Sequence, residues 1–491
     1  MFKKHIRMII CCYIIILNFI VLQESKAVRP NILFIVADDL NSALSSFGHP
    51  QSKTPHLDRL ASEGTSFVRA YCQYPLCGPS RASILSGQYP EKNGVTSLRK
   101  PLEEDALTLP RYFKENGYWT ARVSKLYHMD VPGDIIKGTS GSDHDSSWVE
   151  YYNVRAMETL TPGSFVRNHT SPKAIKSYPE WREKWKTNWV HGDVKKIPGG
   201  SSWVTVETED SSEILPDAMT TDKAVELLRL RAEDKKPFFL GVGFVRPHFP
   251  YVAPAQDFVA YPAESMVIPE VSDNHFNGIP KQAQGKDLKI DRAERQAIHR
   301  SYYACVSYMD RQLGRLLDEL EKLQLKETTI VVFLSDHGYL LGEHRLWKKR
   351  FLWEESVRSP LIISAPGLSK GFQCDQPVEL IDVYPTVVEL AGLPPVEHVQ
   401  GHSLVKMLDN PDAQTGRKDV YAMTHNGHLL RTDKWAYMWY PGNKKIEEGF
   451  TLYDMEKDPQ QYSNLADLPE FSNQRKDLHL RLMERIENST N

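Results

Sequence analysis

The chain has 491 residues, of which 41% are hydrophobic, and a formal net charge of -3. A chain of this length and composition can bury a large core and form more than one domain, so a small binding module is excluded. The nearly balanced charge provides neither a basic footprint for nucleic acid nor an acidic tail, and we expect no nucleic-acid partner.

Residues 1–27 have the features of a secretory signal peptide. Basic residues precede an apolar run from Met8 to Leu22, and Ser25 and Ala27 provide small side chains where cleavage would occur. We therefore predict an exported protein, periplasmic or secreted, with no stable membrane insertion once the signal is cleaved. The alternative is an uncleaved membrane anchor, for which the apolar run is somewhat short.

Two apolar stretches predict buried strands that end in polar side chains. The run "NILFIVADDL" is apolar on both faces, as in a parallel strand, and ends in Asp38 and Asp39. The run "TTIVVFLSDHG" repeats this pattern and ends in Asp336 and His337. Because α/β sheets bind ligands at the carboxyl ends of their strands, we expect a site there.

Strands and helices alternate through residues 28–410. We predict helices over 55–63 and 107–116, strands over 119–123 and 237–244, and a long amphipathic helix over 292–323. The stretches "PLIISAPG" and "LIDVYPTVVELAGL" add further strand and helix signals. This alternation predicts a three-layer α/β domain with a mostly parallel central sheet.

Two regions depart from this alternation. Residues 130–215 are rich in Gly, Ser, aromatic and charged residues and are too long for an ordinary connection, so we predict a loop excursion over the site. Over 411–491 a strand pair in "HLLRTDKWAYMWY" and a final helix predict a smaller C-terminal α+β subdomain. Two of the six cysteines lie in the predicted signal, and the other four are too few for a disulfide framework.

The stretch "LCGPSRASILSG" places Cys77 near a helix start. Pro79 suits the first helical position, so Cys77 should lie just before it, where unpaired backbone amides favour an anion or a group that binds one. Considered alone, Cys77 could equally be a small buried hydrophobic residue.

The stretch "CGPSRASILSG" also resembles the sulfatase signature: cysteine, any residue, Pro-Ser-Arg, three residues, then Leu-Ser/Thr-Gly. The resemblance covers most of the mature chain, is closest to the iduronate-2-sulfatase branch, and implies an alkaline-phosphatase-like fold. It also implies that a formylglycine-generating maturation enzyme oxidises Cys77 to Cα-formylglycine, whose hydrate is the nucleophile. A geminal diol on a divalent cation suits a poor electrophile such as a sulfate ester.

The same resemblance implies a metal site at the two strand ends. Asp38, Asp39 and Asp336 supply hard oxygen ligands that suit Ca²⁺ or Mg²⁺. His337 completes the family's Asp-His or Asp-Asn pair, and the formylglycine derived from Cys77 is the remaining ligand.

Further positions match the family one by one. In "RVSKLYH", Lys125 and His128 match a lysine and a histidine of the site, although Ser124 stands where the family has glycine. In "FVRPHFP", His248 matches a histidine that faces the sulfate. In "GEHRLWKKRF" we choose Lys349 over Lys348 as the sulfate-binding lysine, from its place two residues after Trp347.

These matches imply a role for each side chain. Arg81, Lys125 and Lys349 neutralise charge on the sulfuryl oxygens, His248 protonates the departing sugar oxygen, and His128 removes a proton from the remaining hydroxyl. We thus predict hydrolysis of a sulfate ester on a uronic acid or related sugar of a sulfated polysaccharide or its oligosaccharides. The alternatives are a formylglycine-dependent phosphonate or phosphodiester hydrolase and a noncatalytic polysaccharide-binding relative.

Overall fold

The computed structural model describes residues 29–156, 165–169, 204–208, 214–234, 236–286, 288, 290–368, 370–410, 412–413 and 416–490. The predicted signal peptide and much of the predicted loop excursion lie outside these residues. Within them, no helix has the length and apolarity needed to cross a bilayer.

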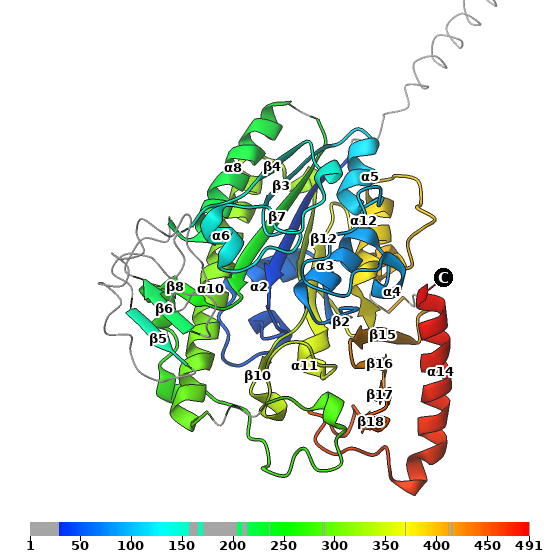
Figure 1. Ribbon diagram of the computed structural model, residues 1–491. Coiled ribbons are helices and arrows are strands. Elements are labelled where there is room, and N and C mark those ends of the chain that lie inside the picture. Colours follow the sequence, from blue (N-terminus) through cyan, green and yellow to red (C-terminus); the bar gives the residue numbers. More distant parts are fainter. Residues whose placement is uncertain are drawn as a thin grey trace, which may run out of the picture.

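A nine-stranded sheet forms the middle layer of the larger domain (Figure 1). The strand order is β13-β2-β12-β9-β1-β7-β3-β4, and β14 also pairs with β2. Among the described strands of this sheet all pairings are parallel except those of β12 with β2 and β9, so the predicted mostly parallel sheet is confirmed. The strands are β1 (Asn31–Asp38), β2 (Thr65–Tyr71), β3 (Trp119–Ser124), β4 (Glu150–Tyr152), β7 (Phe238–Pro247), β9 (Thr329–Ser335), β12 (Arg358–Ser364), β13 (Phe372–Cys374) and β14 (Val378–Glu379).

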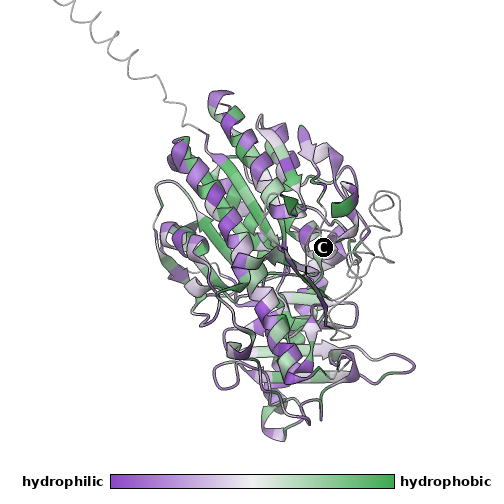
Figure 2. Cartoon of the chain, turned by 90° about the vertical axis from the view of Figure 1, so that its left-hand side faces the viewer, coloured by the Kyte–Doolittle hydropathy of each residue, from purple (hydrophilic) through white to green (hydrophobic). Residues whose placement is uncertain are grey.

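Helices cover both faces of this sheet because its central strand is apolar on both. Ile32 and Phe34 of β1 enter one core, with α3 (Cys77–Ser86), α5 (Leu109–Glu115) and α12 (Val383–Leu390). Leu33 and Ile35 enter the other core, with α2 (Pro55–Glu63), α8 (Pro216–Asp234) and α10 (Arg292–Lys322). Figure 2 shows green strands behind helices that carry purple residues on their outer faces. The layers are those predicted, and the sheet runs continuously under the site.

The segment 130–215 contains more than a loop. It contributes α6 (Gly133–Lys137) and the edge strand β4, which pairs in parallel with β3. It also contributes β5 (Phe165–Asn168) and β6 (Val204–Thr208), which form a separate sheet with β8 (Tyr251–Pro254). These strands are three to five residues long and were missed, since so short a run shows little alternation.

The C-terminal subdomain is a four-stranded antiparallel sheet covered by α14 (Ser472–Thr490), at the lower right of Figure 1. Its strands are β15 (Asp419–Thr424), β16 (Gly427–Thr432), β17 (Trp435–Tyr440) and β18 (Gly449–Asp454). Leu478 and Leu482 of α14 pack on Tyr437 and Leu452. The predicted strand pair is β16 and β17. The predicted boundary after residue 410 falls in the connection between α13 (Val405–Asp409) and β15.

The remaining short α-helices and strands are α4 (Pro90–Asn93), α9 (Ala255–Phe258), α11 (Glu354–Val357), β10 (Leu340–Leu341) and β11 (Trp347–Lys348). Among the described cysteines none forms a disulfide.

Candidate active site

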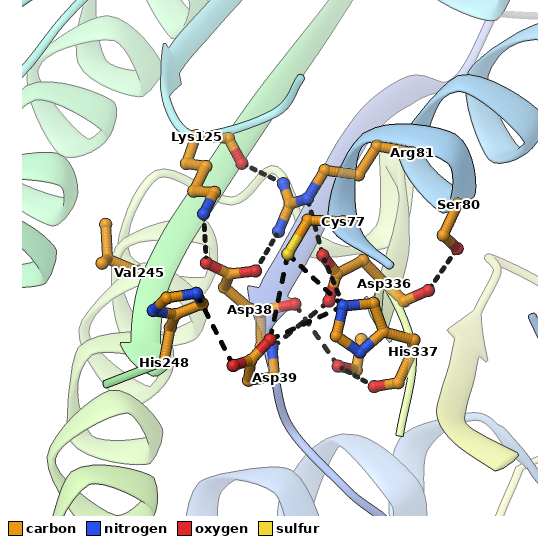
Figure 3. Close-up of polar contacts among 12 residues, drawn as sticks. Asp38, Asp39, Cys77, Ser80, Arg81, Lys125, Val245, His248, Asp336 and His337 are labelled. Atoms are coloured by element: carbon orange, nitrogen blue, oxygen red, sulfur yellow. Dashed lines mark hydrogen bonds and ion pairs between the residues drawn. The ribbon is translucent and has the colours of Figure 1, made fainter. Parts of the chain in front are cut away.

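Two parallel strands deliver the acidic cluster to one edge of the sheet. Ala37 of β1 pairs with Ser335 of β9, so both strands end at the same level. Asp38 and Asp39 therefore lie beside Asp336 and His337, and all four side chains are fully buried (Figure 3). The backbone amide of Asp39 donates to Asp336 Oδ1 at 3.2 Å, which joins the two strand ends directly.

Cys77 is the first residue of α3 and lies over this cluster. The helix begins two residues before Pro79 rather than at it, because the first backbone amides of a helix need no intrahelical partner and Pro79 forfeits nothing there. Cys77 Sγ lies 3.2 Å from Lys349 Nζ, 3.4 Å from His337 Nε2 and 3.9 Å from Asp39 Oδ1. The sulfur thus marks where the oxygens of a formylglycine hydrate would lie.

Arg81 joins the two strand ends to the segment that follows β3. Its Nε donates to Asp336 Oδ2 at 2.8 Å and its Nη2 to Asp38 Oδ1 at 3.3 Å. Its Nη1 donates to the backbone carbonyls of Lys125 and Leu126. The guanidinium is buried and does not line the cavity described below, so its contacts tie the two strand ends to the Lys125 segment. Its predicted neutralisation of charge on the sulfuryl oxygens stays a prediction.

Two lysines neutralise the paired aspartates. Lys125 Nζ donates to Asp38 Oδ2 at 2.5 Å, and Lys349 Nζ donates to Asp39 Oδ1. Lys348 Nζ lies 4.3 Å from the centre of the Phe249 ring, in the wall of the cavity described below. Of the two adjacent lysines, Lys349 is therefore the one beside Cys77.

The two histidines reach the site from different elements. His248 follows β7, and its Nε2 lies 3.6 Å from Asp39 Oδ2 while its Nδ1 contacts the Phe249 carbonyl. His128 follows β3, and its Nε2 lies 3.3 Å from Asp130 Oδ1. Asp130 was not singled out from the sequence, although its position two residues after His128 was a usable signal.

The electrostatics of the cluster favour negative charge at position 77. Burial alone would raise the pKa of Cys77, but the ammonium groups of Lys349 and Lys125 outweigh it and hold that pKa well below its usual value. Burial raises the pKa of Asp336 to about 7 against the opposing charge of Arg81. For His337, burial opposes protonation, yet Asp336 and Cys77 raise its pKa to about 9.

The cluster fits a divalent cation. Asp38, Asp39, Cys77 and His337 each place one ligand atom within 4.8 Å of the others. Asp39 Oδ2 is buried without a hydrogen-bond partner, and such an atom costs free energy unless something binds it. Asp336, the fifth predicted ligand, lies outside this group of four. Both of its oxygens accept hydrogen bonds, from Asp39 and Arg81, but so do both oxygens of Asp38, from Arg81 and Lys125. The predicted ligand role of Asp336 therefore stays a prediction.

A cavity of about 520 Å³ opens above Cys77. Its walls combine cationic and apolar side chains, a mixture that suits an anionic ligand with a carbon frame. They include Cys77, His128, His248, Phe249, Lys286, Trp347, Lys348, Lys349 and Arg350. Phe249 and Arg350 directly follow the predicted residues His248 and Lys349 but were not themselves predicted as wall residues. Lys286 lies in a separate segment, which only folding brings to the cavity.

Fold and site together define an enzyme of α/β architecture in which an acidic cluster that fits a divalent cation lies beside a cysteine at a helix N-terminus. The "Sulfatase" family model matches residues 30–393, and the model of the C-terminal region of N-sulphoglucosamine sulphohydrolase matches residues 342–488. The chain belongs to the sulfatase family, whose members are sulfuric ester hydrolases that use a formylglycine and a divalent metal.

Individual relatives support this assignment. A sulfatase from Formosa agariphila is 33% identical, over 90% of this chain and 84% of its own. Human iduronate 2-sulfatase is 31% identical, over 85% of this chain and 80% of its own. A phosphonate monoester hydrolase from Silicibacter pomeroyi superposes with a TM-score of 0.73 at 21% identity, covering 94% of this chain and 96% of that one, and shares the alkaline-phosphatase-like fold.

Proposed function

We propose that this sulfatase hydrolyses a sulfate ester on a uronic acid or a related sugar of a sulfated polysaccharide or its oligosaccharides. The observation that carries the proposal is the cation-rich cavity above Cys77. Beyond Lys349, which lies at the cysteine, Lys286, Lys348 and Arg350 line the same space. A single sulfate needs fewer positive charges, so the excess favours a substrate with a second anionic group such as a carboxylate.

The similarity to human iduronate 2-sulfatase supports a sugar substrate, and the aromatic rings agree with it. Phe249 and Trp347 stand in the cavity wall beside Lys348, giving apolar surface next to positive charge. An anionic sugar ring offers both an apolar face and charged substituents, so it matches this lining better than a small sulfate ester without a ring does.

The residues divide the work of hydrolysis. With Cys77 converted to formylglycine, the hydrate would supply the attacking hydroxyl. A Ca²⁺ or Mg²⁺ ion would supply positive charge, and the residues that would hold it are Asp38, Asp39, Asp336 and His337 together with the modified Cys77. Arg81, Lys125 and Lys349 add positive charge where the sulfuryl oxygens become more negative. His248 donates a proton to the departing sugar oxygen. His128, whose ring contacts Asp130, accepts the proton of the remaining hydroxyl of the hydrate.

Substrate profiling tests the proposal. Sulfate release is measured on 2-O-sulfated uronate disaccharides and on sulfated neutral disaccharides of equal length, and phenol release is measured on aryl phosphonates and phosphodiesters. We expect kcat/KM to be highest for the uronates, and Cys77→Ala to abolish turnover of every compound. A preference for neutral sulfated sugars would reject the uronate assignment, and a preference for phosphonates or phosphodiesters would reject the sulfate ester as the main substrate.

The proposal also includes export to the periplasm or the outside of the cell, from the predicted signal peptide over 1–27. N-terminal sequencing of the protein recovered from its host tests this. A mature chain that starts near Val28 is expected, and one that keeps Met8–Leu22 would favour the membrane-anchor alternative.

A further inference from the structure

The end of β7 carries an irregularity directly before His248. β7 pairs with β1 from Gly243 opposite Val36 to Pro247 opposite Asp38, so three residues of β7 face one residue of β1. Such a bulge leaves backbone groups without ladder partners. The fully buried carboxylate of Asp217, at the start of α8, accepts the amide of Val245 at 2.7 Å and that of Arg246 at 3.0 Å.

The fully buried side chain of Arg246 holds the turn that follows. Its Nη1 donates to the His248 carbonyl at 2.8 Å, and its Nε donates to the Val252 carbonyl at 2.9 Å. The His248 amide in turn donates to the Val245 carbonyl at 3.0 Å. Both backbone polar groups of His248 are thus bound within one hydrogen-bonded unit, which we term the Asp217–Arg246 brace.

We propose that Asp217 and Arg246 are positioning residues that fix the imidazole of His248 for proton transfer. The proposal rests on the acid role of His248 proposed above. His248 presents Nε2 toward Asp39 and the cavity (Figure 3), while its Nδ1 contacts the carbonyl of its neighbour Phe249. The direction of the ring therefore follows the backbone of this turn. A displacement of about 1 Å at a reacting group can cost roughly a hundredfold in rate.

Leaving-group dependence distinguishes positioning from general stability. The probes are phenyl sulfate, whose phenolate leaves poorly, and 4-nitrophenyl sulfate, whose phenolate leaves with little help. Arg246→Met keeps an unbranched apolar side chain and removes Nε and Nη1, the groups that donate to the carbonyls of Val252 and His248. We expect it to lower kcat/KM roughly a hundredfold for phenyl sulfate and only a few-fold for 4-nitrophenyl sulfate. Arg246→Lys, which restores one donor, should recover part of this loss, and Asp217→Asn should shift the ratio in the same direction.

A matched control removes a buried arginine elsewhere. Arg431 is buried and binds Glu354 and backbone carbonyls without lining the cavity. Arg431→Met should lower the melting temperature and leave the ratio of the two kcat/KM values unchanged. An equal loss on both probes in Arg246→Met, like that of a general structural defect, would overturn the proposal.

A double-mutant cycle tests whether the brace acts through His248. Once His248→Ala has removed the acid, adding Arg246→Met should cause no further leaving-group-dependent loss. Additive losses would overturn the proposal. If His248→Ala loses activity selectively on phenyl sulfate and Arg246→Met does not, only the positioning role of Asp217 and Arg246 is rejected. If the loss in His248→Ala is equal on both probes, the acid role of His248 is rejected as well.

Discussion

Three consecutive cationic residues line one side of the cavity, which an ordinary extended strand would not permit. Side chains of a strand alternate between its faces, yet Lys348, Lys349 and Arg350 all reach the same space. The backbone of Lys348 and Arg350 is left-handed, with φ of 75° and 85°. Each such non-glycine residue costs about 1 kcal/mol, and strain of this kind gathers at functional sites.

Lys348 predicts a pH dependence of substrate capture. Burial and the neighbouring charge of Lys349 lower its pKa to about 8, although Asp39 opposes the shift. The side chain is therefore cationic below pH 8 and neutral above it, so kcat/KM for a dianionic sulfated uronate should fall as the pH rises through 8. Lys348→Arg, which keeps its charge, should move this fall to higher pH, and Lys348→Met should remove it. An unchanged profile in Lys348→Arg would assign the fall to another group.

Cys77 predicts a change of mass on maturation. Replacing the thiol by an aldehyde makes the peptide about 18 Da lighter than the unmodified sequence. Mass spectrometry of the peptide that contains Cys77, from an active preparation, should show the lighter form. Cys77→Ala should fold with nearly the same melting temperature and have no activity. An active preparation that contains only the unmodified cysteine would contradict the formylglycine assignment.

The sequence indicated individual residues of the site better than their bonds. Asp38, Asp39 and Asp336 could be placed together because each ends a long apolar run, and Cys77 because its motif is specific. The contacts of Arg81 depend on which carbonyls the folded chain brings to it, those of Lys125 and Leu126, 44 and 45 residues away. No local pattern in the sequence records such contacts.

At the scale of elements, the end of β3 shows why one departure from the family matters. Ser124 stands where the family has glycine, and its φ is 61°, a left-handed value that glycine adopts without cost. The chain then turns so closely over β7 that a Cβ on Gly243 would lie 2.2 Å from the backbone carbonyl of Lys125. Glycine at 243 therefore sets the position of Lys125.

Gly243→Ala should consequently impair both stability and activity. The new methyl group forces the backbone of Lys125 away from β7, and overpacking of this kind costs about 1–3 kcal/mol. Because Lys125 Nζ binds Asp38, turnover should fall more than the fraction of folded protein does. Chemical denaturation and kcat on folded protein measure the two effects. Gly133→Ala, whose Cβ would make only ordinary contact at 3.5 Å, is the control, and an equal effect there would refute the steric explanation.

Elements with a clear apolar pattern were predictable. The strands β1 and β9 and the helix α10 show such patterns over seven residues or more, so they were located within a few residues. The strand β2 and the helix α8, of seven and nineteen residues, were not predicted. The edge strand β4 has three residues and forms only through pairing with β3. The antiparallel direction of β12 depends on the path of the chain through the whole sheet, which hydrophobic periodicity does not encode.

At the scale of the whole molecule, the buried acidic cluster lowers the free energy of unfolding that the two hydrophobic cores provide. Asp38, Asp39 and Asp336 are fully buried within one cluster, and their mutual repulsion is balanced in part by Arg81 and the two lysines. Asp39 Oδ2, which is buried without a hydrogen-bond partner, offers a ligand atom to a further cation. Ligands that bind only the folded state stabilise it, so the metal should contribute to folding as well as to catalysis.

Chelation should therefore lower activity and the melting temperature together. At a free metal concentration a hundredfold above its dissociation constant, the ion would stabilise the fold by about 2.7 kcal/mol, and its removal should shift the unfolding transition accordingly. Readdition of Ca²⁺ and Mg²⁺ in separate samples shows which ion restores both properties.

Asp39→Asn, which weakens the site while keeping the side-chain volume, should contain less metal by elemental analysis and respond little to chelator. Asp130→Asn, a change next to His128 but outside the metal cluster, should reduce turnover while keeping the wild-type thermal response to chelator. Full activity and an unchanged melting temperature after exhaustive chelation, with no metal found in the protein, would contradict the proposed site, because Arg81, Lys125 and Lys349 would then suffice to neutralise the buried aspartates.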